Sequence, residues 1–298
     1  MKYHISIHIS PYEIDNYQTF IHQLRRNLNY IDDEIIFSPY LNLSEYFYDW
    51  KNSKLKSDYF VNRFNELNNI VKDECKLDST VNFKDKILGA FSYKTMFLEQ
   101  YQDKVDAFIW FDSDMIFPDN AIISLIGAHK ALEDKHCIIT PQIHRLWDET
   151  WDVLVNEDYM NIPASHDNYF GFDGYKLFKN KERDLSVIKN EQNFKFASGW
   201  CNLLTSDLFK DYIKFDYSLG HYGPDDTFIM CLLDYYRHLG NNINQYIIKN
   251  LVVTENYKHS LNQYEGYITK NDNVKTKDEF ASETNQAAGE RINKIIDG

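Results

Sequence analysis

One stretch decides the fold: Phe108-Ile-Trp-Phe-Asp112-Ser-Asp114-Met-Ile-Phe-Pro118. The run from Val105 to Phe111 is almost continuously apolar, which is typical of a central strand buried on both faces. Two carboxylates flank one residue directly after this strand. Open α/β sheets bind their ligands at the carboxyl ends of parallel strands. The stretch therefore predicts an α/β fold with a functional site at Asp112 and Asp114.

The chain before this stretch has the pattern of a β-α-β unit. Residues 3–9 alternate between apolar and polar side chains, as a strand does. A helix is predicted over 17–28, after Pro11, and a second strand over 34–38. Two strands joined by a helix open a parallel sheet with helices on its faces. Apolar residues at helical spacing over 87–101 predict the helix that leads into the 105–111 strand.

The chain after this stretch continues the alternation of strands and helices. The predicted elements are a helix over 118–131, a strand over 137–140, a strand followed by a helix within 196–213, a helix over 227–239 and a strand over 246–253. We assign residues 1–265 to one domain, with a partly helical insertion at 43–82 and loops, a hairpin or a lid at 144–195. Residues 266–298 form a polar tail, predicted to be a peripheral helix or a mobile segment.

Composition excludes several classes of protein. The 298 residues are 43% hydrophobic, as in globular chains, and the net charge of −13 comes with no basic stripe, which argues against nucleic-acid binding. No apolar run approaches the ~18 residues of a membrane span. The N-terminus lacks the pattern of a signal peptide, so a cytoplasmic location is the default expectation. Four widely spaced cysteines predict neither a disulfide framework nor a zinc site.

Aromatic residues are unusually frequent, at 16% of the chain. Rings stack on sugars and nucleobases, but we favour the simpler explanation, a codon or lineage bias toward Tyr, Phe, Ile, Asn and Lys. The oligomeric state leaves no signal in the sequence.

Asp112 and Asp114 are candidate metal ligands. Two carboxylates this close repel each other unless a cation lies near them. A hard divalent ion prefers oxygen ligands and bridges readily to substrate phosphates. The alternative is that one Asp only caps the following helix.

Asp225 and Asp226 form a second acidic pair, after a loop rich in glycine and at the predicted start of a helix. A carboxylate there can act as a general base toward an acceptor hydroxyl. The alternative is that both acids only compensate the helix macrodipole.

Other candidates rest on weaker patterns. Lys94 interrupts an apolar stripe and either points toward a diphosphate or extends to solvent. Gly199 and Trp200 either line a pocket with a stacking ring or form a turn with a core Trp. His259 follows the last strand and is either structural or a third metal ligand.

The order of these segments resembles the GT-A class of nucleotide-sugar glycosyltransferases, near its family-2-like group. The resemblance covers roughly residues 1–262 and implies a GT-A fold, Rossmann-like, with a mostly parallel sheet flanked by helices. It implies that Asp112-Ser113-Asp114 is the DxD motif, which holds Mn²⁺ or Mg²⁺ on the diphosphate of the donor.

The resemblance also implies roles for the other candidates. Gly199 and Trp200 match the glycine loop loosely, and His259 matches a late metal-binding His by order. Asp225-Asp226 stands where the class usually has Glu-Asp, so either acid could be the base; we favour Asp226. Pro11 and Tyr12 follow the first strand, where the class binds the nucleobase.

The activity that the resemblance implies is transfer of a sugar from a UDP- or GDP-sugar to a glycan or other hydroxyl acceptor. The acidic pair favours inversion. Two other functions remain open: a carbohydrate- or divalent-ion-binding module without catalysis, and a haloacid-dehalogenase-like phosphatase. In the phosphatase class D-x-D follows a strand near the start of the domain, whereas here a β-α-β unit precedes it.

Overall fold

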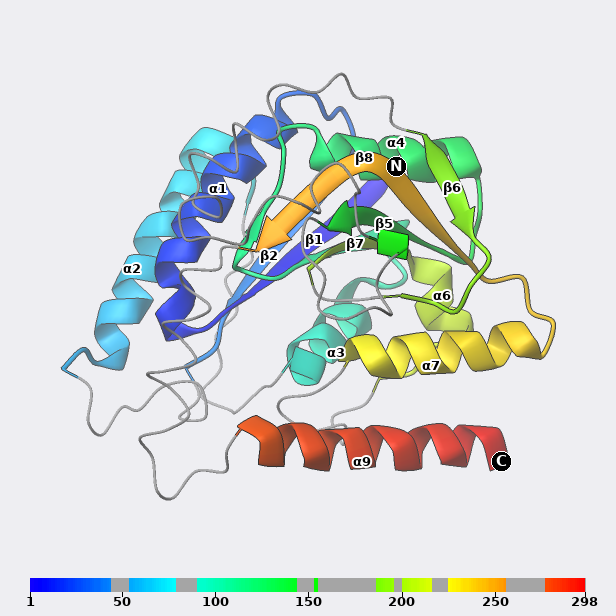
Figure 1. The fold of residues 1–298 in the computed structure, drawn as a ribbon. Helices are drawn as coiled ribbons and strands as arrows, with labels where there is room; N and C mark the ends of the chain where they lie inside the picture. Colours follow the sequence, from blue (N-terminus) through cyan, green and yellow to red (C-terminus); the bar gives the residue numbers. More distant parts are fainter. Residues whose placement is uncertain are drawn as a thin grey trace, which may run out of the picture.

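The centre of the protein is one eight-stranded sheet, seen in a computed structural model (Figure 1). The structure describes residues 1–43, 54–78, 90–143, 153–154, 186–195, 200–215, 225–255 and 277–297. The strands are β1 (Lys2–Ile9), β2 (Glu34–Leu41), β3 (Ala107–Phe111), β4 (Met115–Ile116), β5 (Cys137–Ile143), β6 (Val187–Asn190), β7 (Cys201–Thr205) and β8 (Asn244–Glu255). Their order is β2-β1-β3-β7-β5-β8-β4, with β6 paired to β8.

Most of the long strands run in one direction. β1 pairs in parallel with β2 and β3, and β5 pairs in parallel with β8. β7 lies antiparallel between β3 and β5, so β5 has the direction of β3. The carboxyl ends of β1, β2, β3, β5 and β8 therefore lie at one edge of the sheet. The expected mostly parallel α/β sheet is confirmed, with β7 as its antiparallel central member.

Helices cover both faces of the sheet, as Figure 1 shows. Their bounds are α1 (Ile14–Leu28), α2 (Ser57–Ile70), α3 (Ala90–Tyr101), α4 (Ala121–Leu132), α6 (Ser206–Asp211), α7 (Asp225–His238) and α9 (Lys277–Asp297), with a 3₁₀ turn η1 (Pro11–Glu13) and a π-helical turn η2 (Val71–Cys75). α1, α2 and α4 pack on one face, and α3, α6 and α7 pack on the other.

The alternating sequence of β1 accounts for how both faces are filled. Tyr3, Ile5 and Ile7 belong to the core cluster under α1 and α4. His4 points to the opposite face, where its ring stacks on Tyr101 of α3 with centroids 4.5 Å apart. β3 is buried on both faces, as its apolar run predicts. Phe111, the last residue of β3, is therefore held by packing on both faces of the sheet.

Residues 43–82, which we predicted to be an insertion, contribute the helix α2, which packs on α1. Phe64 of α2 lies against Tyr17 of α1, with ring centroids 5.6 Å apart, and the Tyr17 hydroxyl donates to Asn68 Oδ1 at 2.7 Å. η2 then ends α2, and Lys76 follows in the left-handed conformation with φ 57°. Residues 54–78 thus add a further layer on the α1 face of the sheet.

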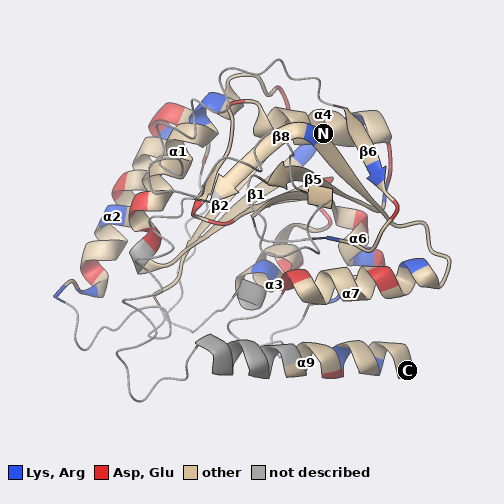
Figure 2. Ribbon diagram, viewed as in Figure 1, with Lys and Arg blue, Asp and Glu red and all other residues tan. Residues whose placement is uncertain are grey.

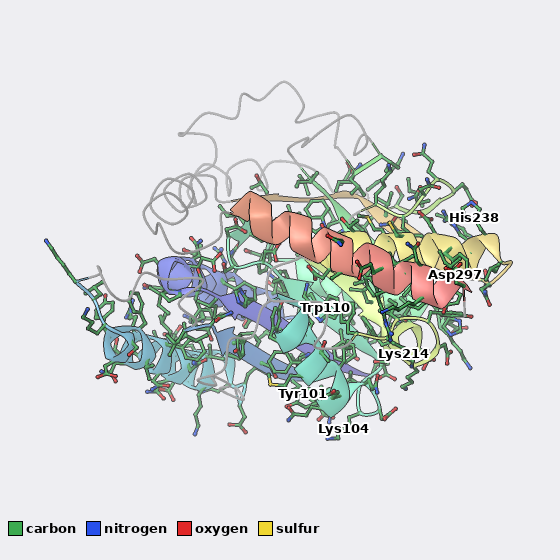
Figure 3. The ribbon with its side chains drawn as sticks, turned by 90° about the horizontal axis from the view of Figure 1, so that it is seen from below. Tyr101, Lys104, Trp110, Lys214, His238 and Asp297 are labelled. Carbon is green, nitrogen blue, oxygen red and sulfur yellow. The ribbon has the colours of Figure 1, made fainter. Side chains whose placement is uncertain are left out.

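The described part of the polar tail is the long helix α9, which lies along α7 in Figures 1 and 3. Ala288 is buried there, and Ile292 and Ile295 pack against the core cluster on the α7 face. Of the two expectations for the tail, the peripheral helix is the one that holds over Lys277–Asp297.

Charged residues and cysteines are distributed over several elements. In Figure 2, Lys and Arg of the described ribbon are interspersed with Asp and Glu and form no stripe. All four cysteines are free thiols; Cys75, Cys137 and Cys201 are buried, whereas Cys231 on α7 is exposed. None of the described helices is both long and apolar enough to cross a membrane.

Candidate functional site

The two aspartates of the predicted DxD motif lie in a tight turn at the end of β3. The Asp112 amide donates to the carbonyl of Trp200 at 3.3 Å, which extends the β3–β7 ladder by one bond. The Met115 amide then donates to the Asp112 carbonyl at 3.3 Å and closes the turn. β4 follows at once and pairs Met115 with Glu255, at the end of β8. The backbone on both sides of the motif is thus fixed by the sheet.

Two buried amides on α1 hold the segment after the motif. Gln23 accepts from the Phe117 amide at 2.7 Å and donates to the Met115 carbonyl at 3.2 Å. One turn later, Asn27 donates to the Pro118 carbonyl at 3.0 Å and accepts from the Ile122 amide at 2.8 Å. These side chains satisfy backbone groups that would otherwise be buried without partners. Gln23 and Asn27 were not predicted from the sequence. The signal that could have identified them is two polar residues, four positions apart, on the apolar face of an amphipathic helix.

Asp112 lies in an electrostatic environment that disfavours a lone carboxylate. Burial, with the charges of Asp114 and Asp225 adding to it, raises the pKa of Asp112 to about 8, although Lys94 opposes the shift. Ser113, between the two acids, is buried, and its Oγ has no hydrogen-bond partner among the described residues. A cation near these carboxylates would relieve their repulsion.

The second acidic pair occupies the first turn of α7, where the helix macrodipole favours negative charge. Burial and the neighbouring charge of Asp225 raise the pKa of Asp226 to about 6, against a lowering hydrogen bond from the Thr227 amide and the charge of Lys94. That amide donates to Asp226 Oδ1 at 2.7 Å. A carboxyl group with this pKa can accept or hold a proton near neutral pH.

Lys94 joins the two acidic pairs. Its ammonium group donates to Asp225 Oδ2, and its side chain is 2% exposed. Its charge also acts on Asp112 at the end of β3. The structure therefore brings together three segments that are far apart in the sequence. They carry Lys94, the pair Asp112 and Asp114, and the pair Asp225 and Asp226. Lys94 does not extend to solvent.

A polar and aromatic cluster borders these charges at the ends of β1 and β2. The His8 ring stacks on Tyr93 at 5.2 Å and Tyr40 at 6.1 Å, and its Nε2 lies 3.1 Å from Asn42 Nδ2. Burial lowers the pKa of His8 to about 4; the charge of Lys94 adds to this shift, whereas the charges of Glu13 and Asp225 oppose it. Our sequence analysis did not single out this cluster, because its members look like ordinary strand and helix residues.

The chain resembles known proteins in its fold and not in its sequence. No known protein-family model matches the chain, and no curated protein sequence matches it. Among solved structures, the GT-A glycosyltransferase TarS of S. aureus aligns with a TM-score of 0.51, 10% identity and 98% coverage of this chain. Its 1–349 fragment aligns with a TM-score of 0.51, 11% identity, and coverage of 97% of this chain and 70% of the fragment.

The chain has the GT-A fold. It spans 43% of the longer TarS chain, and the low identity makes this a likeness of fold alone.

The other predicted site residues are either buried or outside the described part of the chain. Trp200 is 1% exposed and belongs to the core cluster under α1 and α4. Its ring is therefore a core ring and is not open for stacking on a ligand, contrary to that prediction. Pro11 is buried at the start of η1, while the Tyr12 side chain, Gly199 and His259 lie outside the described residues.

The donor set fits a hard divalent cation held partly by substrate. The described residues contain no group of three His, Cys, Asp or Glu side chains arranged for a metal. Asp112 and Asp114 supply two carboxylates at one turn. Mg²⁺-like ions commonly bind through one or two carboxylates together with substrate phosphates. The carboxylates of Asp112 and Asp114 thus have the chemistry that such an ion requires.

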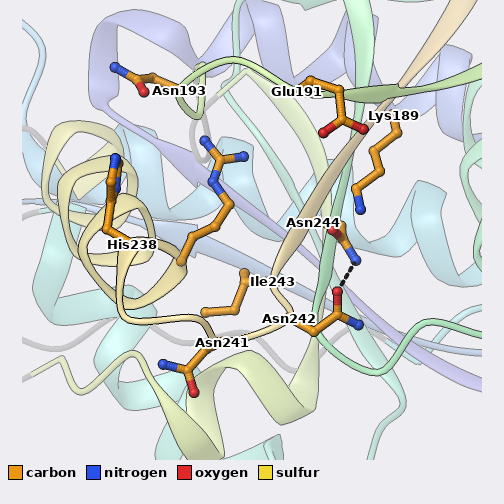
Figure 4. A pocket seen from close by; sticks show the side chains of 9 residues that line it. Lys189, Glu191, Asn193, His238, Asn241, Asn242, Ile243 and Asn244 are labelled. Carbon is orange, nitrogen blue, oxygen red and sulfur yellow. Dashed lines mark hydrogen bonds between the residues drawn. The ribbon is translucent and has the colours of Figure 1, made fainter.

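A polar pocket lies away from this site, at the end of α7 and the start of β8 (Figure 4). Its volume is about 320 Å³, and its lining includes Lys189, Glu191, Arg237 and Asn244. Asn244 donates to Asn242 at 3.2 Å, and Arg237 pairs with Asp234 at 2.9 Å. Because β8 runs from this pocket toward β4, the pocket lies at the opposite edge of the sheet from Asp112.

Proposed function

We propose that this protein is a metal-dependent glycosyltransferase that moves a sugar from a UDP- or GDP-sugar to an acceptor hydroxyl, with inversion. One observation carries the proposal. The DxD turn at the end of β3 and the acidic start of α7 face the same buried cation, Lys94. This arrangement supports a diphosphate-type site and a candidate base at one edge of the sheet.

In this proposal Asp112 and Asp114 hold Mn²⁺ or Mg²⁺, and His259 adds a third ligand. When bound, the ion supplies Lewis-acid stabilisation of the leaving diphosphate. β8 ends at Glu255, four residues before His259, and Glu255 pairs with Met115 next to the motif. The chain thus leads into the His259 segment from beside Asp114, which supports that role.

We assign the proton transfer to Asp226. The acceptor oxygen attacks C1 of the sugar, the C1–O bond breaks, and its electron pair leaves with the nucleoside diphosphate. The acceptor proton passes to the Asp226 carboxylate. Asp225 is the weaker candidate for the base because it already binds the Lys94 ammonium.

The donor is held at the ends of β1 and β3. Pro11 and Tyr12 follow β1 and border the nucleobase, and Gly199, two residues before β7 in the sequence, contributes to the donor site. We do not assign stacking to Trp200, because its ring is in the core. The acceptor is a glycan or another hydroxyl compound.

A thermal-shift screen tests the proposal. UDP-, GDP-, CDP- and dTDP-sugars are added with and without Mn²⁺, and calorimetry then measures the affinity of the best nucleotide. We expect stabilisation by a UDP- or GDP-sugar that requires Mn²⁺, since bound ligand stabilises the folded state. Asp112→Asn and Asp114→Asn should each abolish the Mn²⁺-dependent part.

Asp119→Asn is the matched control. Asp119 lies close in sequence but is on the surface, where it pairs with Arg26 at 3.0 Å. It should bind donor like the natural chain. Nucleotide binding that is indifferent to both Mn²⁺ and the two motif variants would refute the metal-dependent mechanism.

A further inference from the structure

The charge of Lys94 acts on members of both acidic pairs and on His8. Lys94 lies in the first half of α3 and is 2% exposed. Its Nζ lies 4.6 Å from the ring centroid of Trp110, which is 0% exposed. An ammonium group this deeply buried needs a partner, because desolvation of an unpaired charge is costly. Asp225 is that partner.

We propose that Lys94 is a positioning residue, which ties the start of α7 to α3 and β3 through Asp225 and thereby presents Asp226 to the acceptor. This inference rests on the proposed function for the role of Asp226, but the tie itself does not. It differs from a role in binding the donor diphosphate, for which an exposed ammonium group would be expected.

Three elements converge on the Lys94 side chain. α3 carries it, β3 supplies the Trp110 face beneath it, and α7 supplies the Asp225 carboxylate. Cation–π contact and ion pairing both strengthen in a desolvated setting. α7 begins at Asp225 itself, so the pair fixes the first residue of the helix. Any shift of Lys94 would therefore displace the turn that carries Asp226.

The two acids of the pair differ in what surrounds them. Asp225 is 8% exposed and binds the ammonium group, whereas Asp226 accepts local bonds from the amide and the hydroxyl of Thr227. An acid held in a buried ion pair is poorly placed to take a substrate proton. The ion pair thus divides the acidic pair into a structural member and a reactive member.

A double-mutant cycle tests the tie without any substrate. Urea unfolding is measured for the natural chain, Lys94→Met, Asp225→Asn and the double variant. Removing one partner of a buried ion pair leaves the other charge uncompensated, whereas removing both does not. We expect Lys94→Met to lower the unfolding midpoint strongly or to prevent folding. The double variant should recover at least half of the loss.

Lys104→Met is the matched control, because Lys104 is exposed just beyond the other end of α3 (Figure 3). It should leave the midpoint nearly unchanged. Additive losses, or a double variant that folds no better than Lys94→Met, would overturn the tie. The cycle gives its answer even if no nucleotide sugar binds, in which case only the proposed function fails.

A second experiment separates positioning from diphosphate binding. Lys94→Arg and the double variant are assayed for sugar transfer and, by calorimetry, for affinity toward UDP or GDP with Mn²⁺. If Lys94 positions α7, transfer by the double variant falls at least tenfold, while nucleotide affinity stays within threefold of the natural chain. Lys94→Arg retains the charge and should keep more activity than the double variant. A tenfold loss of nucleotide affinity with an unchanged turnover number would overturn the proposal.

Discussion

Single side chains in the site are distinguished by their immediate surroundings rather than by residue type. Asp112, Asp225 and Asp226 are all aspartates, and each has a second acid nearby. Only Asp225 also binds a buried ammonium group, whereas Asp226 accepts hydrogen bonds from Thr227. These surroundings raise the pKa of Asp112 to about 8 and that of Asp226 to about 6, in each case first through burial. Chemically different roles therefore follow from position.

Asp226→Asn should reduce sugar transfer by about 10²–10⁴-fold, because the amide cannot accept the acceptor proton. Metal-dependent donor binding, followed by calorimetry, should survive. Asp211→Asn, on the exposed end of α6 beside His136, is the control and should transfer sugar normally. Full turnover by Asp226→Asn would remove this residue from the mechanism.

Sugar transfer should fall on acidification through a pH of about 6, the pKa to which Asp226 is raised. The sign follows from the role: a base must be deprotonated, so activity is present above this pKa and is lost below it. A pH–rate profile at saturating donor measures the limb. A flat profile between pH 5 and pH 7 would contradict the assignment of Asp226.

At this scale the sequence singled out the acids and Lys94 as candidates but not the residues that surround them. A DxD directly after an apolar strand is a specific pattern, so Asp112 and Asp114 could be found from it alone. His8, Gln23 and Asn27 carry no such pattern, because a polar residue inside a strand or helix is usually solvent-facing. Only the packing of α1 against the turn gives Gln23 its role. The burial of Trp200 likewise depends on tertiary packing.

The elements of the fold cooperate to immobilise the DxD turn. β1 and β7 flank β3, β4 pairs with the end of β8, and α1 contributes two amides from the other layer. Each of these contacts joins segments far apart in sequence. The turn is therefore stabilised by the sheet and by α1 jointly, which suits a site that must bring two like charges together.

Gln23→Leu should lower the free energy of unfolding by about 2–4 kcal/mol, because the Met115 carbonyl and the Phe117 amide lose a buried partner. It should also weaken Mn²⁺-dependent donor binding by loosening the turn. Urea unfolding and calorimetry measure the two effects. His22→Leu, on the exposed side of the same helical turn, should change stability by no more than about 0.5 kcal/mol. Equal stability of the two variants would show that the amide contacts matter little.

Element type was predictable, whereas strand direction was not. Alternation in β1 and the apolar run in β3 gave the strands, and apolar spacing gave α3, α4 and α7. Nothing local in Cys201–Thr205 tells that β7 runs against its neighbours, because direction follows from the path of the chain between strands. β4 is also beyond sequence reasoning, because two residues carry no periodicity.

For the whole molecule, two buried ionisable groups change the free energy of unfolding with pH in opposite directions. They are His4 and Asp112. Burial lowers the pKa of His4 to about 3, well below its value of about 6.5 in an unfolded chain. Between these values the unfolded chain binds a proton that the folded chain does not, so stability falls as pH falls. Asp112 acts oppositely, because its raised pKa makes the folded chain hold a proton between about pH 4 and pH 8.

Replacing His4 should therefore flatten the acid side of the stability curve. His4→Phe combined with Ser38→Ala removes the ring and its 2.9 Å hydrogen-bond partner together. The difference in unfolding free energy between this variant and the natural chain should shift in favour of the variant by about 1 kcal/mol from pH 6 to pH 5. Urea unfolding at both pH values gives the number. A difference that does not change with pH would mean that His4 becomes charged in the folded protein.

The placement of the four thiols makes the unaltered chain suitable for labelling at one position. Burial raises the pKa of Cys75, Cys137 and Cys201, and each of these side chains is out of reach of solvent. Cys231 is exposed, five residues beyond Asp226 on the same helix. A maleimide dye should thus add once per folded chain, as mass spectrometry would show, and addition at several cysteines would contradict it. A fluorophore so attached would report changes around α7, the helix that carries Asp226, as they occur.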